Sequence, residues 1–113
     1  MTLMVAAMAG CGSSLDVSTT QTACITPGQP VTLHVHTLPS TQLTWSVQDD
    51  FTGDLAPAIP AQTTDSGGNA TTTWQSPGQL STTTLHFLLV AVNGDQRANR
   101  DIHVVVGGNG RQC

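Results

Sequence analysis

The stretch TTTLHFLLVAVNG, residues 82–94, decides the fold of this chain. From Leu85 onward the residues on both faces of this stretch are apolar, apart from His86. Such a run is typical of a strand that is covered on both sides. We therefore expect residues 82–92 to form the longest strand, inside a sheet. The Asn-Gly pair that follows favours a tight hairpin, and residues 102–106 are expected to return beside this strand.

Two further segments alternate between apolar and polar residues, with the period of a half-buried strand. Residues 30–38 place three aliphatic side chains on one face and polar side chains, including His34 and His36, on the other. Residues 42–47 place Trp45 between two aliphatic residues on one face. A large aromatic side chain in that position predicts the centre of the core.

The other segments predict short strands and turns. A short strand is expected at residues 23–25. Residues 49–60 contain two prolines and a glycine and predict a long connection with an irregular edge strand at 55–59. The Thr-rich residues 62–74 are expected to form a hairpin about Asp-Ser-Gly-Gly-Asn at 65–69, where both glycines supply positive φ. The pattern predicts an all-β, immunoglobulin-like β-sandwich of about seven strands.

Several short motifs make this prediction more specific. They are the Thr-Thr-Asp-Ser-Gly-Gly-Asn-Ala run with its flanking strands (63–74), Pro-Gly-Gln-Pro-Val (27–31), Trp-Ser-Val (45–47) and the Asn-Gly hairpin (93–94). Together they resemble bacterial Ig-like domains of the invasin and intimin kind. The resemblance covers residues 24–106 and implies the sandwich fold. It does not imply a long adhesive stalk, because the chain has no tandem repeats.

The apolar run LMVAAMAGC, residues 3–11, ends at a cysteine. It is too short to span a bilayer, which takes about 20 residues, but it has the length of a signal-peptide core. Its end, Met8-Ala9-Gly10-Cys11, resembles a bacterial lipobox. The resemblance implies a lipid on Cys11, and Gly12 after it implies sorting to the outer membrane.

These observations predict the organisation of the chain. We expect a lipoprotein signal peptide at 1–10, a lipidated cysteine and flexible tether at 11–22, the sandwich at 23–106 and a flexible tail at 107–113. No basic residue precedes the apolar run, so we expect the native start to lie upstream. The alternative is an ordinary N-terminal tail with an incidental cysteine.

Composition limits the classes of partner. Only 9% of the residues are charged, the net charge is −4, and the basic residues number three. Nucleic-acid binding needs clustered Lys or Arg, so we expect no nucleic-acid partner. The excess of Thr, Ser, Asn and Gly is typical of a secreted, β-rich protein.

If Cys11 carries a lipid, Cys24 and Cys113 remain as an even pair. In an oxidising compartment such a pair predicts a disulfide that ties the two ends of the domain. Free or intermolecular thiols are the alternative. Neither cysteine belongs to the usual pattern of the resembled domains.

The four histidines are candidates for metal ligands. His34 and His36 have the spacing of an H-x-H pair on one strand face. His86 and His103 are candidates because their strands are predicted to pair, but they belong to the opposite sheet, so the four side chains cannot converge. We therefore predict no metal site and no cofactor, and we expect the histidines to face solvent. If the chain does bind a metal, His34 and His36 are the candidate ligands.

No pattern indicates catalysis. Asp49 and Asp50 are adjacent and point to opposite sides, unlike paired carboxylates that share a proton. No serine lies in a Gly-x-Ser-x-Gly elbow, and residues 65–69 lack the acidic ligands of a calcium loop. We therefore expect that the chain is not an enzyme.

The sequence predicts a non-enzymatic, lipid-anchored Ig-like binding or structural module of the bacterial cell envelope, held at a membrane by its N-terminal lipid and contacting a protein partner. Its predicted working surface is the connection at residues 49–60 with the loops near it. The alternatives are an accessory lipoprotein subunit of a larger envelope assembly and a small periplasmic protein that binds a metal or ligand.

Overall fold

The computed structural model describes residues 15–49, 55, 57–79 and 84–107. These residues form eight strands and no helix. The strands are β2 (Ser18–Gln21), β3 (Cys24–Ile25), β4 (Pro30–His36), β5 (Gln42–Gln48), β6 (Gln62–Thr63), β7 (Asn69–Gln75), β8 (Thr84–Asn93) and β9 (Gln96–Val106).

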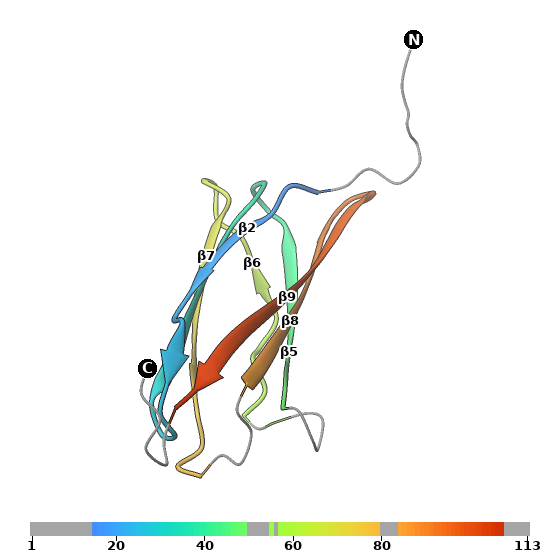
Figure 1. Cartoon of the computed structure of the whole chain (residues 1–113). Helices are drawn as coiled ribbons and strands as arrows, with labels where there is room; N and C mark the ends of the chain where they lie inside the picture. The colour runs from blue at the N-terminus through green and yellow to red at the C-terminus, as the bar shows by residue number, and fades with distance from the viewer. Residues whose placement is uncertain (1–14, 50–54, 56, 80–83, 108–113) are drawn as a thin grey trace.

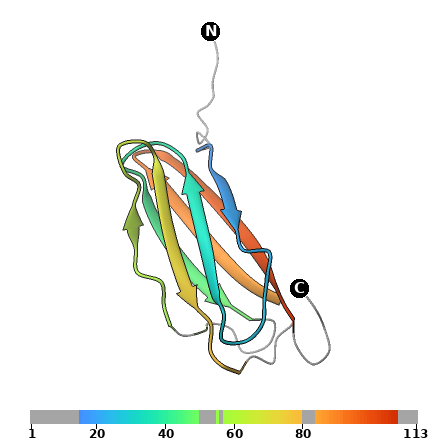
Figure 2. The ribbon, with the colours of Figure 1, turned by 90° about the vertical axis from the view of Figure 1, so that its left-hand side faces the viewer.

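The strands form two facing sheets (Figures 1 and 2). One has the order β2-β4-β7 and the other the order β3-β9-β8-β5-β6. Figure 2 shows the three-stranded sheet in front of the five-stranded one. The molecule is an immunoglobulin-like β-sandwich, so the predicted fold class is confirmed.

Strand β8 lies between β9 and β5, as its two apolar faces predicted. Among the described residues β8 has 10 residues and β9 has 11. Residues 82 and 83 of the predicted strand lie outside the described part of the chain. The returning strand starts at Gln96, directly after a two-residue turn at Gly94 and Asp95, and pairs along the whole of β8. Its first half reads as polar, which is why the sequence indicated only residues 102–106.

The core fills the space between the sheets. Alternate side chains of β4, β5, β8 and β9 are buried there, as their period of two predicts. Trp45 is buried as expected, with 6% of its surface exposed. Trp74 of β7 packs edge-to-face on Phe87 at a ring distance of 5.5 Å. The buried apolar residues are Leu15, Ile25, Val31, Leu33, Val35, Leu43, Trp45, Val47, Ile59, Trp74, Leu85, Phe87, Leu89, Ala91, Ala98, Ile102, Val104 and Val106.

The sandwich begins earlier than the sequence indicated. Leu15 is 2% exposed, and its N–H donates to the Arg97 carbonyl at 3.3 Å. Strand β2 pairs with β4. The prediction of a tether through residue 22 is therefore wrong for residues 15–22. This strand is polar because it lies at a sheet edge, where backbone hydrogen bonds rather than apolar side chains hold it.

After β2 the chain crosses to the other sheet. The short strand expected at residues 23–25 is present as β3, which pairs with β9 in parallel. The first part of the fold thus contributes one strand to each sheet. Just beyond β9, the Gly107 N–H donates to the Ile25 carbonyl and extends the pairing of β3 with β9.

The turn at residues 65–69 is present, but it does not join a hairpin. Strand β6 pairs with β5 and β7 pairs with β4, so the turn carries the chain from one sheet to the other. Asp65 closes the turn by accepting hydrogen bonds from the Gly67 and Asn69 N–H groups at 2.9 Å. Of the two glycines only Gly68 has a positive φ, +81°.

The described residues of the predicted edge strand, 55 and 57–59, form no strand. A short edge strand of the five-stranded sheet, β6, follows a few residues later. Leu55 donates to the Val47 carbonyl and Ile59 is buried, so the connection is held against the core without a regular ladder, as its prolines require. Residues 50–54 and 56 of the predicted connection lie outside the described residues. No helix in the described part of the chain is long and apolar enough to cross a membrane.

Candidate functional site

The histidines lie on two opposite outer faces. His34 and His36 project from β4 on the outer face of the three-stranded sheet. Ring atom Nδ1 of His34 lies 2.9 Å from Thr71 Oγ1, and Nδ1 of His36 lies 2.9 Å from Asn69 Oδ1. They line a shallow depression of about 310 Å³. No third metal-ligating side chain joins them among the residues described here.

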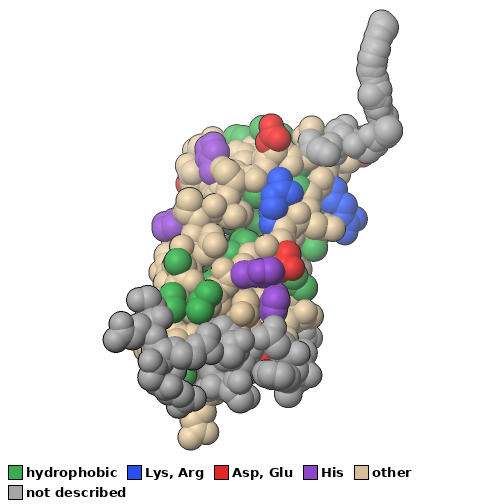
Figure 3. Space-filling view, viewed as in Figure 1, with side chains coloured by type: hydrophobic (Ala, Val, Ile, Leu, Met, Phe, Trp, Pro, Cys, Tyr) green, Lys and Arg blue, Asp and Glu red, His purple; other side chains and the backbone are tan. Residues whose placement is uncertain are grey.

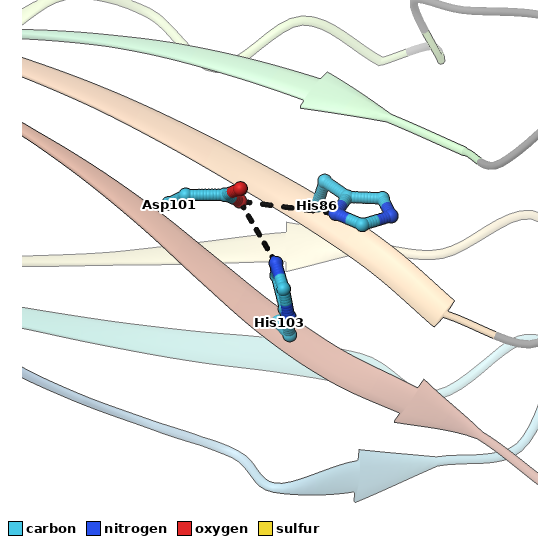
Figure 4. Close-up of polar contacts among 3 residues, drawn as sticks. All are labelled: His86, Asp101 and His103. Atoms are coloured by element: carbon cyan, nitrogen blue, oxygen red, sulfur yellow. Dashed lines mark ion pairs between the residues drawn. The ribbon is translucent and has the colours of Figure 1, made fainter.

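The other two histidines meet a carboxylate on the five-stranded sheet (Figures 3 and 4). His103 Nε2 lies 3.2 Å from Asp101 Oδ1, and His86 Nδ1 lies 3.8 Å from the same oxygen. The two imidazole rings are edge-to-face with centroids 4.6 Å apart. Among the described residues, this is the one group of three metal-ligating side chains whose ligand atoms all lie within 4.8 Å of one another.

The strand register builds this cluster. His86 of β8 lies directly opposite His103 of β9, and Asp101 precedes His103 by two residues on the same face. Figure 4 shows both rings directed at the carboxylate. The cluster is open to solvent, with side-chain exposures of 27% for His86, 55% for Asp101 and 56% for His103.

The prediction that the four histidines cannot converge is confirmed, because they lie on different sheets. The sequence indicated His34 and His36 as the candidate pair and did not indicate Asp101, whereas the structure groups three potential ligands at His86, Asp101 and His103. The signal that could have found Asp101 is the Asp-x-His spacing on a strand predicted to pair with the strand of His86. The sequence indicated that pairing only for residues 102–106, which excluded Asp101.

The strand connections at one end of the sandwich are tied together by polar contacts. Gly28 N donates to Ser76 Oγ at 2.9 Å, and that hydroxyl donates to the Gln29 carbonyl at 2.7 Å. Trp74 Nε1 donates to the Pro57 carbonyl at 2.7 Å. These bonds fix three separate connections to the same rigid scaffold, an arrangement suited to recognition by loops.

The cysteines are described only in part. Cys24 begins β3 and is disulfide-bonded. Cys11 and Cys113 lie outside the described residues, as does Asp50.

Comparisons with known proteins define the fold and no more. No protein-family model and no curated protein matches the sequence. A similar solved structure is Escherichia coli alpha-2-macroglobulin activated by porcine elastase, with a TM-score of 0.71 and 13% identity. The match covers 88% of this chain and 13% of that chain. This chain is thus similar in fold to a small part of a much longer protein.

Proposed function

We propose that the chain is a non-enzymatic Ig-like binding or structural module of the bacterial cell envelope, anchored by a lipid on Cys11. The observation that carries this proposal is the separation of the two ends of the sandwich. Leu15 is bonded to Arg97 beside the β8–β9 hairpin. The connections that follow β5 and β7 lie at the opposite end, where β9 finishes.

This geometry gives the anchor and the loops different directions. Cys11 precedes Leu15 by four residues, which span at most about 14 Å. A lipid on Cys11 would therefore hold the hairpin end near the membrane. The tied connections around Gln29, Pro57 and Ser76 would face away from it, available to a protein partner.

The remaining cysteines fit the same proposal. Cys24 lies opposite Val105, and Leu15 contacts Arg97, eight residues earlier on β9. Those eight residues span about 26 Å of strand. A disulfide needs Cα atoms within about 7 Å, so the segment before Leu15 is too short to bring Cys11 to Cys24. Cys113 follows Gly107 by six residues, and a segment of that length is long enough to bring Cys113 to Cys24. We propose a Cys24–Cys113 disulfide, which leaves Cys11 available for the lipid.

Mass spectrometry of the mature protein, expressed from its native gene, tests the anchor. We expect an N-terminal Cys11 carrying a thioether-linked diacylglycerol, and a membrane fraction that retains the protein. A Cys11→Ser variant should lose both, whereas Ser14→Ala, a matched change nearby, should lose neither. An unprocessed Met1 with a free Cys11 thiol would overturn the anchor.

Site-specific photocrosslinking in cells tests the binding surface. A crosslinking residue at Gln29, which is exposed at the loop end, should capture a protein partner. The same residue at Asp95, which is exposed in the β8–β9 hairpin, should not. The reverse result would contradict the proposed orientation. A partner that co-purifies stoichiometrically after mild detergent extraction would favour an accessory subunit of a larger assembly over a free-standing module.

A further inference from the structure

The cluster of His86, Asp101 and His103 has the composition of a three-ligand metal site. Imidazole nitrogens and a carboxylate oxygen are ligands that Zn²⁺ accepts. All three side chains come from two long, directly paired strands of the five-stranded sheet, so their relative positions are fixed by the ladder rather than by a loop. Placement on regular strands gives a site precision that loops do not.

The ligand atoms are already close to the spacing that zinc requires. With Zn–N distances of about 2.0–2.1 Å, ligand atoms at the corners of a tetrahedron lie about 3.3 Å apart. His103 Nε2 and Asp101 Oδ1 are 3.2 Å apart, and His86 Nδ1 and Asp101 Oδ1 are 3.8 Å apart. The widest separation within the group is below 4.8 Å. Small rotations of the exposed Asp101 and His103 side chains, and of the half-buried His86 side chain, would close the remaining gap.

The three ligand atoms face one another. One nitrogen of each imidazole is directed at the same carboxylate oxygen (Figure 4). A neutral imidazole offers a lone pair at one ring nitrogen. A metal ion placed among the three atoms would accept a lone pair from each of them.

We propose that His86, Asp101 and His103 bind one Zn²⁺ ion, with the fourth coordination position open to solvent and filled by water. Zinc fits this group because it has no geometric preference from its d electrons and takes three protein ligands plus water in open sites. The ion would replace the ion-pair contacts of Asp101 and join β8 to β9 on the outer face of the sheet. This inference does not rest on the proposed envelope function.

Calorimetric titration with zinc chloride tests the site. The protein is the untagged full chain with Cys11→Ser, under non-reducing conditions, so that no thiol at that position competes for the ion. We expect one Zn²⁺ per chain. His86→Gln, Asp101→Asn and His103→Gln should each weaken binding at least tenfold, since each removes one of three ligands.

The matched control is the double variant His34→Gln/His36→Gln, which removes the other exposed histidine pair at the same spacing on a strand. It should keep the wild-type affinity within about twofold. Loss of binding in this control, with binding retained in the three site variants, would overturn the proposal. Absence of any heat at 100 μM wild-type protein would overturn it as well.

Three further measurements test the site and exclude an effect through folding. Circular dichroism, measured without zinc, should show the same spectrum for the three site variants as for the wild type. Zinc should raise the unfolding temperature of the wild type but not of His86→Gln, because a ligand stabilises only the state that binds it. In imidazole ¹⁵N spectra, zinc should shift the signals of His86 and His103 and leave those of His34 and His36. Shifts confined to His34 and His36 would refute the site.

Discussion

Replacing Gly68 by alanine should destabilise the sandwich more than any other exchange of glycine for alanine among the described residues. Gly68 has φ +81°, and a Cβ built on it would lie 2.0 Å from the Thr37 carbonyl oxygen. The left-handed conformation costs an L-residue about 1–2 kcal/mol. Relief of the clash must move the turn and weaken the 2.8 Å hydrogen bond from Thr37 N to the Gly68 carbonyl, for about 0.5–1.5 kcal/mol more.

The free energy of unfolding should therefore fall by about 1.5–3.5 kcal/mol. For a domain of this size, each kcal/mol shifts the unfolding temperature by about 4–8 °C, so we expect a decrease of roughly 6–28 °C. Urea unfolding, followed by the fluorescence of the two buried tryptophans, measures the change in the free energy of unfolding.

Two other glycines separate the causes. Gly94 has φ +58° but open space at its Cβ, so Gly94→Ala should show only the conformational cost of about 1–2 kcal/mol. Gly78 has neither a positive φ nor a close neighbour, and Gly78→Ala should stay within about 0.5 kcal/mol of the wild type. If Gly68→Ala and Gly94→Ala cost the same within about 0.5 kcal/mol, the close approach to Thr37 is not a constraint and the reasoning fails.

Three other sets of substitutions test the packing, the disulfide and the start of the domain. Trp74→Phe removes a hydrogen bond to the Pro57 carbonyl, whereas Trp45→Phe removes an N–H that has no partner in the described structure. In chemical denaturation, Trp74→Phe should therefore cost about 1–3 kcal/mol more than Trp45→Phe. Equal costs would contradict a stabilising role for the Trp74 hydrogen bond. In the chain-entropy model, Cys24→Ser and Cys113→Ser should each lower the free energy of unfolding by about 4–5 kcal/mol. Reduction of the wild type with dithiothreitol should lower it by the same amount. Unequal losses in the two variants would exclude a disulfide between these cysteines. Leu15→Ala should cost about 2–4 kcal/mol in the same denaturation assay, whereas a residue in a flexible tether would cost nothing.

The sequence predicts individual strands well because burial of one face is a local signal. The alternation around Trp45, and the two apolar faces of residues 84–93, both hold in the structure. What alternation cannot specify is the partner of a strand. The turn at 65–69 has the residues of a tight turn. Even so, β6 before the turn pairs with β5, and β7 after it pairs with β4, in different sheets.

Polar segments show the same limit more strongly. Strand β2 is rich in Ser and Thr, and its pairing with β4 depends on backbone groups that every residue carries. Nothing in its side chains distinguishes it from a tether. Asp101 was missed for a related reason, because its closeness to His86 arises from the register of β8 with β9 and not from spacing along the chain.

The proposed metal site and the proposed binding end belong to the same half of the molecule. His86 lies opposite Gln48, the last residue of β5, after which the long connection begins. The site is thus beside the loop end, whereas Leu15 contacts the opposite end through Arg97. A membrane that holds Cys11 at the opposite end would not cover the open coordination position. The two proposals therefore remain independent in their chemistry and compatible in their geometry.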